Sequence, residues 1–246
     1  MYYFFKKNIK KIIPIEFLVK NELIFRWFYG IFFLGEKHQC NICNKKLRTF
    51  IKLKTNDLLC PFCGSLSRNR RLWQLLTHQK KLNGNLLHFS PSRSLYRKLK
   101  KEKAVNYFST DYENEFLADY KFDITKINQE SNKFDIIICY HILEHVIEDT
   151  KAMLELHRVL KPNGTIYIQT PFKEGDIYED YSITLEEDRL MHFGQRDHVR
   201  IYSIQGLKNR LEQKKLYVKV ISFNHENNDV FYGFKSPETI LTVTKK

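Results

Sequence analysis

The chain has 246 residues, of which 43% are apolar, and its 41 Lys and Arg against 28 Asp and Glu give a formal net charge of +13. That apolar share is enough to bury a core, so disorder throughout the chain is excluded. The nine glycines are so widely spaced that no GxG occurs, which excludes the dinucleotide-binding GxGxxG loop and the phosphate-binding GxxxxGKS/T loop.

The positive charge is concentrated in the first half of the chain. Residues 1–110 hold 23 basic and 5 acidic side chains, a net of +18, whereas residues 111–246 hold 18 basic and 23 acidic, a net of −5. This asymmetry indicates a polyanionic partner or an anionic membrane surface. No run of 18 apolar residues occurs, so no transmembrane helix is expected.

Residues 1–37 are predicted to form a basic, aromatic helical segment. Lysines alternate there with aromatic and aliphatic residues, and an apolar run broken only by Arg26 follows from Leu23 to Leu34. One interpretation is an amphipathic segment that makes peripheral contact with an anionic membrane. The alternative is a helix packed on the rest of the protein with solvated lysines.

Two CxxC pairs mark a small zinc-ribbon-like module within residues 38–83, and they consist of Cys40 with Cys43 and Cys60 with Cys63. The two-residue spacer lets both sulfurs of a pair face one ion, and four thiolates suit tetrahedral zinc. A structural Zn²⁺ on these four residues is therefore predicted; an iron–sulfur cluster and metal-free thiols are the alternatives. Paired cysteines that bind metal rather than form disulfides favour a cytoplasmic protein.

A helix is predicted over residues 65–82, and Arg68, Arg70 and Arg71 crowd its first half. Such a cluster can bind phosphate groups. An exposed, solvated helix face explains the same arginines.

Strands and helices alternate from about residue 84 onwards. The predicted strands span residues 85–89, 104–110, 120–122, 134–139, 165–170, 217–223 and 239–244, and the predicted helices span 92–100, 148–160 and 203–214. Ser92 is expected to cap the first of these helices. Repeated strand–helix units with short turns predict an α/β fold with an open parallel sheet that is covered on both faces. Sheets of this kind bind ligands at the carboxyl ends of their strands.

Polar residues follow the first four of these strands. Ser90 comes after the first, Asp111 ends the second, Asp123 follows the third, and Tyr140 and His141 follow the fourth. A carboxylate after the second strand can accept hydrogen bonds from both hydroxyls of a ribose. Each Asp alone would also fit a turn or a helix cap, but their order along the strands forms a pattern.

Two stretches, FDIIICYHILEH at 134–145 and RVLKPNG at 158–164, resemble the class I S-adenosylmethionine-dependent methyltransferases, in particular the type 11 group, over about residues 84–246. CPFCGSLSR at 60–68 and FGQRDHVR at 193–200 resemble a bacterial subgroup with a two-knuckle zinc module before the methyltransferase domain. The resemblance implies a Rossmann-like, seven-stranded, mostly parallel sheet whose last strand is antiparallel.

By position, the resemblance implies S-adenosylmethionine as the cofactor and assigns its contacts. Asp111 is expected to bind the ribose hydroxyls, Asp123 and Ile124 to lie against the adenine, and Tyr140 and His141 to border the methionine moiety.

The family's glycine-rich loop after the first strand is replaced here by HFSPS at residues 88–92. S-adenosylmethionine has no phosphate to cradle. The expected contacts from this loop are therefore backbone groups and the Ser90 hydroxyl.

Two histidines are candidate catalytic bases for an acceptor that must lose a proton, His145 and His198. Beside His198, Asp197 is expected to orient a ring and Arg200 to hold an anionic acceptor; a surface turn with a salt bridge is the alternative. The acidic stretch 174–188 is expected to form a lid or rim over the acceptor, or a solvated loop. No second metal site is predicted.

The chain is thus predicted to be an S-adenosylmethionine-dependent methyltransferase that acts on a small-molecule, glycan-linked or lipid-linked acceptor. We expect it in the cytoplasm, peripheral at the inner face of the membrane. One alternative is an RNA methyltransferase whose zinc knuckles and arginine cluster grip RNA. The other is a non-catalytic binding protein with the methyltransferase fold.

Overall fold

The computed structural model describes Phe17 and residues 21–78, 82–225 and 229–245. Its contacts divide the chain into two compact units, one of residues 1–74 with 227–235, and the other of residues 75–226 with 236–246. The predicted domain boundaries after residues 37 and 83 stay predictions, and most of the predicted basic segment lies outside the described residues. Among the helices of the described residues, none is long and apolar enough to span a membrane.

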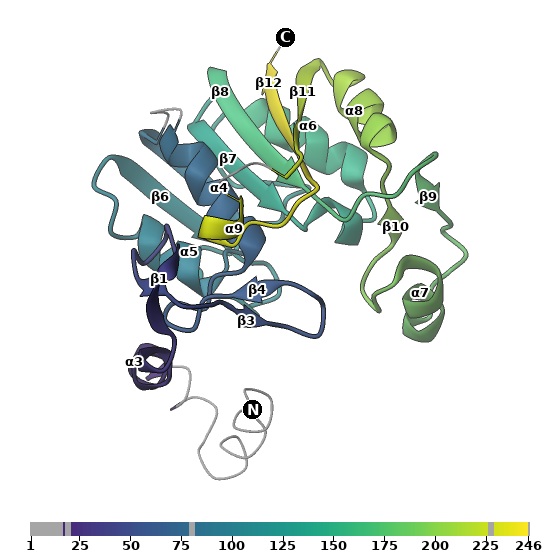
Figure 1. The fold of residues 1–246 in the computed structure, drawn as a ribbon. Coiled ribbons are helices and arrows are strands. Elements are labelled where there is room, and N and C mark those ends of the chain that lie inside the picture. Colours follow the sequence, from purple (N-terminus) through teal and green to yellow (C-terminus); the bar gives the residue numbers. More distant parts are fainter. Residues whose placement is uncertain (1–16, 18–20, 79–81, 226–228, 246) are drawn as a thin grey trace. The chain divides into compact units, whose positions relative to one another are not determined.

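The first unit is built from short elements (Figure 1). They are α3 (Glu22–Ile31), β1 (Leu34–Gln39), β2 (Lys46–Leu47), β3 (Ile51–Lys52), β4 (Leu58–Leu59), the first two turns of α4 (Ser67–His78), and α9 (Asp229–Tyr232). β1 pairs antiparallel with β2, and β3 pairs antiparallel with β4. The helical prediction for residues 1–37 fails at its end, because the backbone from Leu34 onwards pairs with β2.

The second unit contains a six-stranded sheet with the order β11-β12-β8-β7-β5-β6. Its strands are β5 (Gly84–Phe89), β6 (Val105–Thr110), β7 (Phe134–Tyr140), β8 (Leu160–Gln169), β11 (Leu216–Phe223) and β12 (Glu238–Lys245). β5, β6, β7 and β8 are parallel to one another, whereas β12 is antiparallel to both of its neighbours. The prediction of a mostly parallel sheet with an antiparallel last strand is confirmed.

The number of strands differs from the predicted seven. The predicted strand at residues 120–122 makes only a single bridge, in which Tyr120 lies parallel to Thr110 at the edge beside β6. Pairing stops there because the backbone N–H of Phe122 donates to the side-chain Oγ1 of Thr110, at 2.7 Å, instead of to a strand carbonyl. Asp123 then closes a turn by accepting from the N–H of Thr125.

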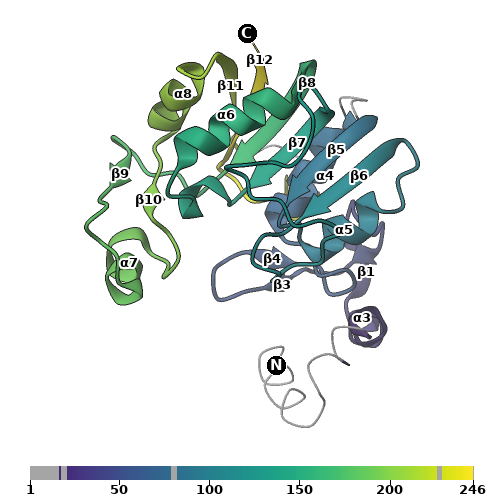
Figure 2. The same ribbon diagram turned by 180° about the vertical axis from the view of Figure 1, so that it is seen from behind.

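Helices α6 (Asp149–Val159) and α8 (Ile204–Glu212) cover one face of this sheet (Figure 2). Their apolar sides, including Leu156 and Leu207, are buried in one core cluster with residues of the central strands. Two serines begin helices as N-caps. Ser92 accepts from the N–H of Leu95 at the start of α5 (Arg93–Leu99), as predicted, and Ser203 caps α8.

Two short segments at the carboxyl ends of β7 and β8 carry most of the polar residues discussed below. The 3-10 turn η1 (Leu143–His145) follows β7 directly. Between β8 and α8 lie β9 (Tyr178–Glu179), α7 (Glu186–Phe193) and β10 (Arg200–Ile201), and β9 pairs antiparallel with β10.

Candidate active site and metal centre

The four predicted metal-binding cysteines come together in the first unit, with ligand atoms all within 4.8 Å of one another. Cys40 Sγ lies 3.6 Å from Cys63 Sγ, and Cys43 Sγ lies 3.7 Å from Cys60 Sγ. A tetrahedron with metal–sulfur bonds of about 2.3 Å has sulfur–sulfur edges of about 3.8 Å. The cluster therefore has the size that a tetrahedral Zn²⁺ requires.

A buried cation lies beside this cluster. The Ser65 hydroxyl is 3.4 Å from Cys40 Sγ and 3.2 Å from Cys63 Sγ, and Arg70 donates to the same residue's carbonyl at 2.7 Å. Arg70 is fully buried, and its charge lies close to the thiols. Hydrogen bonds within the cluster, that with Cys43 first, hold the pKa of Cys40 well below its usual value. A positive charge here offsets the net negative charge of a Zn²⁺ with four thiolates.

Both predictions for the arginine cluster fail at Arg70 and Arg71, which are fully buried and belong neither to a phosphate site nor to an exposed helix face. Arg70 also donates to the carbonyls of Tyr232 and Gly233, and Arg71 forms an ion pair of 2.8 Å with Asp229. The two guanidinium groups therefore tie the 229–235 segment, which lies between β11 and β12 in the chain, to the cysteine module.

In the second unit, the ends of β5 and β6 bring Ser90 and Asp111 together. The Ser90 hydroxyl donates to Asp111 Oδ1 at 2.7 Å, and Asp111 Oδ2 accepts the backbone N–H groups of Glu115 and Phe116 at 2.6 and 3.0 Å. Asp111 is buried, with 5% of its surface exposed. A carboxylate has about four lone-pair sites, so one remains for a ligand hydroxyl, and a second hydroxyl would displace Ser90.

The residues assigned to the adenine and methionine contacts lie along the same edge of the sheet. Asp123 Oδ1 accepts both the N–H and the hydroxyl of Thr125, and Ile124 is part of the core cluster. Tyr140 is the last residue of β7 and is buried. His141 follows it with a backbone φ of +54°, a left-handed conformation that is uncommon outside glycine and is often found at functional sites.

Buried polar atoms without a hydrogen-bond partner gather at the carboxyl ends of β7 and β8. Within the described part of the chain they include His141 Nε2, Glu144 Oε2, Gln169 Oε1, Thr170 Oγ1 and His198 Nε2. Most buried polar groups in proteins are satisfied. A concentration of exceptions at the ligand-binding edge of a parallel sheet therefore indicates a binding site.

The two predicted catalytic histidines lie next to each other, with ring centroids 4.7 Å apart in an edge-to-face arrangement. His145 Nδ1 lies 3.0 Å from Asp197 Oδ2, so Asp197 orients His145 and not its own neighbour in the sequence. Burial lowers the pKa of His198, and the charge of His145 lowers it further. His198 is thus neutral near pH 7. Their catalytic role stays a prediction.

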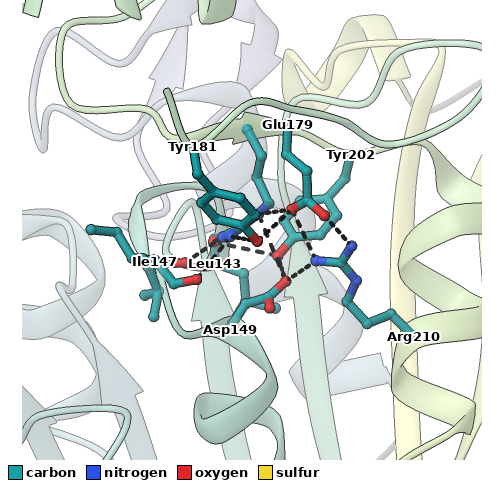
Figure 3. A network of polar contacts seen from close by, with 9 residues as sticks. Leu143, Ile147, Asp149, Glu179, Tyr181, Tyr202 and Arg210 are labelled. Atoms are coloured by element: carbon teal, nitrogen blue, oxygen red, sulfur yellow. Dashed lines mark hydrogen bonds and ion pairs between the residues drawn. The ribbon is translucent and has the colours of Figure 1, made fainter. Parts of the chain in front are cut away.

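Arg200 does not face an acceptor as the sequence suggested. It is fully buried, forms an ion pair of 2.8 Å with Glu179, and donates to the carbonyls of Leu143, Val146 and Ile147 (Figure 3). Its donors are used to hold β10 against the η1 turn, which makes it a positioning residue.

Glu179 and Asp149 complete this buried network (Figure 3). Arg210 contacts both of them, and the hydroxyl of Tyr202 donates to Asp149 at 2.6 Å. The hydrogen bonds of Arg210, followed by those of Arg200, lower the pKa of Glu179 to about 2. Within the acidic stretch expected to form a lid, Glu179 is therefore part of a structural network.

Sequence reasoning did not single out Glu144, Gln169 and Thr170 as members of this polar cluster. Glu144 is 1% exposed. Burial alone would raise the pKa of its carboxyl, but contact with His141 and the charge of His145 hold it below the usual value. The sequence feature that could have identified Glu144 is its position between His141 and His145, directly after a buried strand.

Residues 79–168 match the family model described as "Methyltransferase domain". The structure is similar to a SAM-dependent methyltransferase from Archaeoglobus fulgidus, with 16% identity and a TM-score of 0.51 over 73% of this chain and 95% of that one. The comparison with curated proteins gives no match.

Two further solved structures show the same fold. Phosphoethanolamine N-methyltransferase 2 from Haemonchus contortus, solved with phosphomonomethylethanolamine and S-adenosylhomocysteine, is 15% identical, with a TM-score of 0.50 over 72% of this chain and 52% of that one. The [4+2]-cyclase SpnF is 16% identical, with a TM-score of 0.50 over 71% of this chain and 80% of that one. The fold therefore does not by itself fix the reaction.

The resemblance found in the sequence is confirmed by the family match and by the order and direction of the strands. Residues 79–168 match the methyltransferase domain model, and the second unit, which contains this stretch, has the fold of class I S-adenosylmethionine-dependent methyltransferases.

Proposed function

We propose that the protein transfers the methyl group of S-adenosylmethionine to a small-molecule, glycan-linked or lipid-linked acceptor. The observation that carries the proposal is the group of buried, partnerless polar atoms at the carboxyl ends of β7 and β8, on a chain that matches the methyltransferase family. When bound, S-adenosylmethionine supplies a methyl group on a sulfonium that is already activated for displacement.

The described residues fit this cofactor. Asp111 would hold the ribose through its remaining lone pair, and Ser90 orients that carboxylate. Asp123 and Ile124 are proposed to contact the adenine. The left-handed backbone of His141, directly after β7, is proposed to present main-chain groups to the methionine moiety.

The protein's own contribution to methyl transfer is alignment, exclusion of water and, for an acceptor that carries a proton, a base. His145 and His198 are proposed for this last role. The Asp197 carboxylate, 3.0 Å from His145 Nδ1, orients the His145 ring. In the first unit, Cys40, Cys43, Cys60 and Cys63 would hold a structural Zn²⁺.

Calorimetric titration of the full chain with S-adenosylmethionine tests the proposal. Asp111→Asn should weaken binding at least tenfold, because it removes a charge-assisted hydrogen bond worth about 1.5–3 kcal/mol. Asp176→Asn, an equal charge change at an exposed acid, should bind as the wild type does. If the wild type does not bind at millimolar cofactor, methyl transfer is rejected and a non-catalytic binding protein is favoured.

An acceptor with an anionic lipid-linked group is our preferred class, with the protein in the cytoplasm at the inner face of the membrane. Helix α3 supports this proposal, because its large apolar side chains Trp27 and Phe28 are 50% and 60% exposed, and Phe32, directly after the helix, is 71% exposed. The sequence before this helix is rich in lysine. Aromatic residues next to basic ones suit the interface of an anionic bilayer.

Co-sedimentation of the full chain with vesicles of neutral or anionic phospholipid tests this membrane contact. Binding should require anionic lipid and should weaken when Trp27 and Phe28 are replaced by Ser. Equal binding to neutral vesicles, or none to either, would contradict it. RNA stays the second choice as acceptor. Arg70 and Arg71, two of the three arginines proposed to bind it, are buried and cannot contact RNA.

A further inference from the structure

Three side chains of metal-binding type meet in the second unit, close to the carboxyl end of β7. Glu144 and His145 come from the η1 turn after β7, and His198 comes from the segment just before β10. One ligand atom from each of them lies within 4.8 Å of the other two. Two histidines and one carboxylate form a donor set that holds divalent transition metals and leaves a coordination position open.

Two of the three side chains of this cluster are buried, and each keeps a ligand atom that is unused. Glu144 is 1% exposed and His198 is 3% exposed. Glu144 Oε1 lies 3.3 Å from His141 Nδ1, whereas Glu144 Oε2 and the Nε2 atom of His198 have no hydrogen-bond partner in the described part of the chain. Burying an ionised carboxylate and an imidazole nitrogen in this way is unfavourable unless something binds to them.

The other ring nitrogen of each histidine is already held. His145 Nδ1 lies 3.0 Å from Asp197 Oδ2, and His198 Nδ1 lies 3.3 Å from the carbonyl oxygen of Phe193. Metal-binding histidines usually donate this second N–H to a carboxylate or a carbonyl, which fixes the ring and directs the free nitrogen towards the metal. Both rings here have that arrangement.

The two segments that supply the ligands are fastened to each other. The backbone N–H of Val199 donates to the carbonyl of Glu144 at 2.9 Å. Arg200 donates to the carbonyls on both sides of the turn, at Leu143 and Ile147. This fastening holds ligands that are more than fifty residues apart in the sequence in a fixed geometry, as a metal site requires.

We propose that Glu144, His145 and His198 bind one divalent metal ion such as Zn²⁺, and that an oxygen atom of the methyl acceptor occupies its open coordination position. With both imidazoles bound to the metal they could not act as bases; the ion would instead lower the pKa of a hydroxyl bound to it and fix that oxygen for reaction. The site itself rests on the geometry of this chain. Its role towards the acceptor rests on the proposed methyl transfer.

The test is zinc binding by the full chain. The cysteine module is first loaded with one equivalent of Zn²⁺, and further Zn²⁺ is then titrated by calorimetry with no S-adenosylmethionine present. The wild type should bind a second equivalent. His198→Gln and Glu144→Gln should each weaken this second event by more than tenfold, whereas His157→Gln, a histidine change on α6 outside the cluster, should leave it unchanged.

A positioning variant covers the case in which a ligand variant does not fold. Asp197 is 67% exposed at its side chain, so Asp197→Asn should leave the fold intact and still weaken the second Zn²⁺ about tenfold by releasing His145. The proposal is wrong if the wild type binds only one equivalent of Zn²⁺. It is also wrong if the Asp197→Asn and His198→Gln proteins both bind two equivalents as the wild type does.

The outcome is separable from that of the proposed function. A protein that binds a second Zn²⁺ but no S-adenosylmethionine would keep the metal site and reject the methyltransferase. A protein that binds the cofactor but only one Zn²⁺ would do the opposite.

Discussion

At the residue scale, Ser90 in the loop after β5 adopts a backbone conformation that favours glycine. Its backbone φ is +43°, in the left-handed region where residues with a side chain are strained. Its hydroxyl meanwhile donates to the buried Asp111. Serine therefore supplies a turn that glycine would form more easily, and adds an orienting hydrogen bond that glycine lacks. This loop departs from the family pattern in sequence while keeping the left-handed backbone at Ser90.

His88 is a second residue whose environment can be tested directly. It is 3% exposed, its Nδ1 lies 3.1 Å from the hydroxyl of Tyr107, and burial lowers its pKa to about 3 from 6.5. The pKa of His88 is lower in the folded state than in the unfolded state. As the pH falls, the unfolded state therefore binds a proton on this residue before the folded state does. The contribution of this residue to stability is thus complete above pH 6.5 and is lost as the pH falls towards 3.

We therefore predict that His88→Gln flattens the pH dependence of unfolding. Between these two pH values the buried neutral histidine makes the free energy of unfolding fall by up to about 1.4 kcal/mol per pH unit as the pH decreases. Urea unfolding of the wild type should become easier with falling pH more steeply than that of the variant. The exposed His192→Gln protein should follow the wild type. Parallel curves for all three proteins would mean that His88 is not buried in its neutral form.

At the element scale, the segment from β9 to β10 is held by charges rather than by a long strand pair. β9 and β10 are each two residues long. Arg200 reaches from β10 to Glu179 on β9 and to three carbonyls around η1. The low pKa of Glu179 keeps this network charged down to strongly acidic pH, so its contribution is present above the usual pKa of glutamate and is lost only as the pH falls towards 2.

Arg200→Lys should loosen this segment even though it keeps the positive charge. A lysine ammonium cannot reach four acceptors in different directions, so buried carbonyls lose their donors, at about 1–3 kcal/mol each. Hydrogen exchange should speed up at residues 143–147 and 178–201 and stay unchanged in β5. Arg196→Lys, at an exposed ion pair with Glu187, is the matched control and should change little. Unaltered exchange around η1 would show that Arg200 does not hold it.

At the scale of the whole molecule, the cysteine module includes a segment from the other end of the chain. Arg70 and Arg71 connect α4 to the residues around α9, and Val230 accepts a hydrogen bond at its carbonyl from His38. The cysteine cluster and the residues 227–235 between β11 and β12 therefore belong to one unit and should lose structure together.

Removal of the metal should unfold that unit selectively. Chelation of zinc from the full chain is expected to abolish hydrogen-exchange protection at residues 38–74 and 229–235, because the four buried thiolates repel one another once the ion that held them together is removed. Protection in the strands β5 to β8 should persist. Loss of protection in both units at the same rate, or a segment 229–235 that stays protected, would contradict this organisation.

Much of the fold follows from local signals in the sequence. The apolar strand predicted at 134–139, the Ser92 cap of α5, and the helices predicted at 148–160 and 203–214 depend on residues within a few positions of one another, and all of these elements occur close to their expected bounds. The two CxxC pairs likewise predicted the cysteine cluster, because each pair needs only a short turn to bring its sulfurs together. The roles of the predicted cofactor residues stay predictions.

Other features were decided only by contacts between distant parts of the chain. Asp229 lies 158 positions from the arginine it pairs with, and Val199 lies more than fifty positions from Glu144. No local pattern marks such partners, because topology and not spacing brings them together. The same reason explains why Arg70 and Arg71 are buried and not exposed. It also explains why the strand predicted at 120–122 makes only one bridge, and why ligand atoms of His145 and His198 lie within 4.8 Å of Glu144. The sequence by itself determined the class of fold and the cysteine cluster, whereas the tertiary structure decided which polar residues share a site.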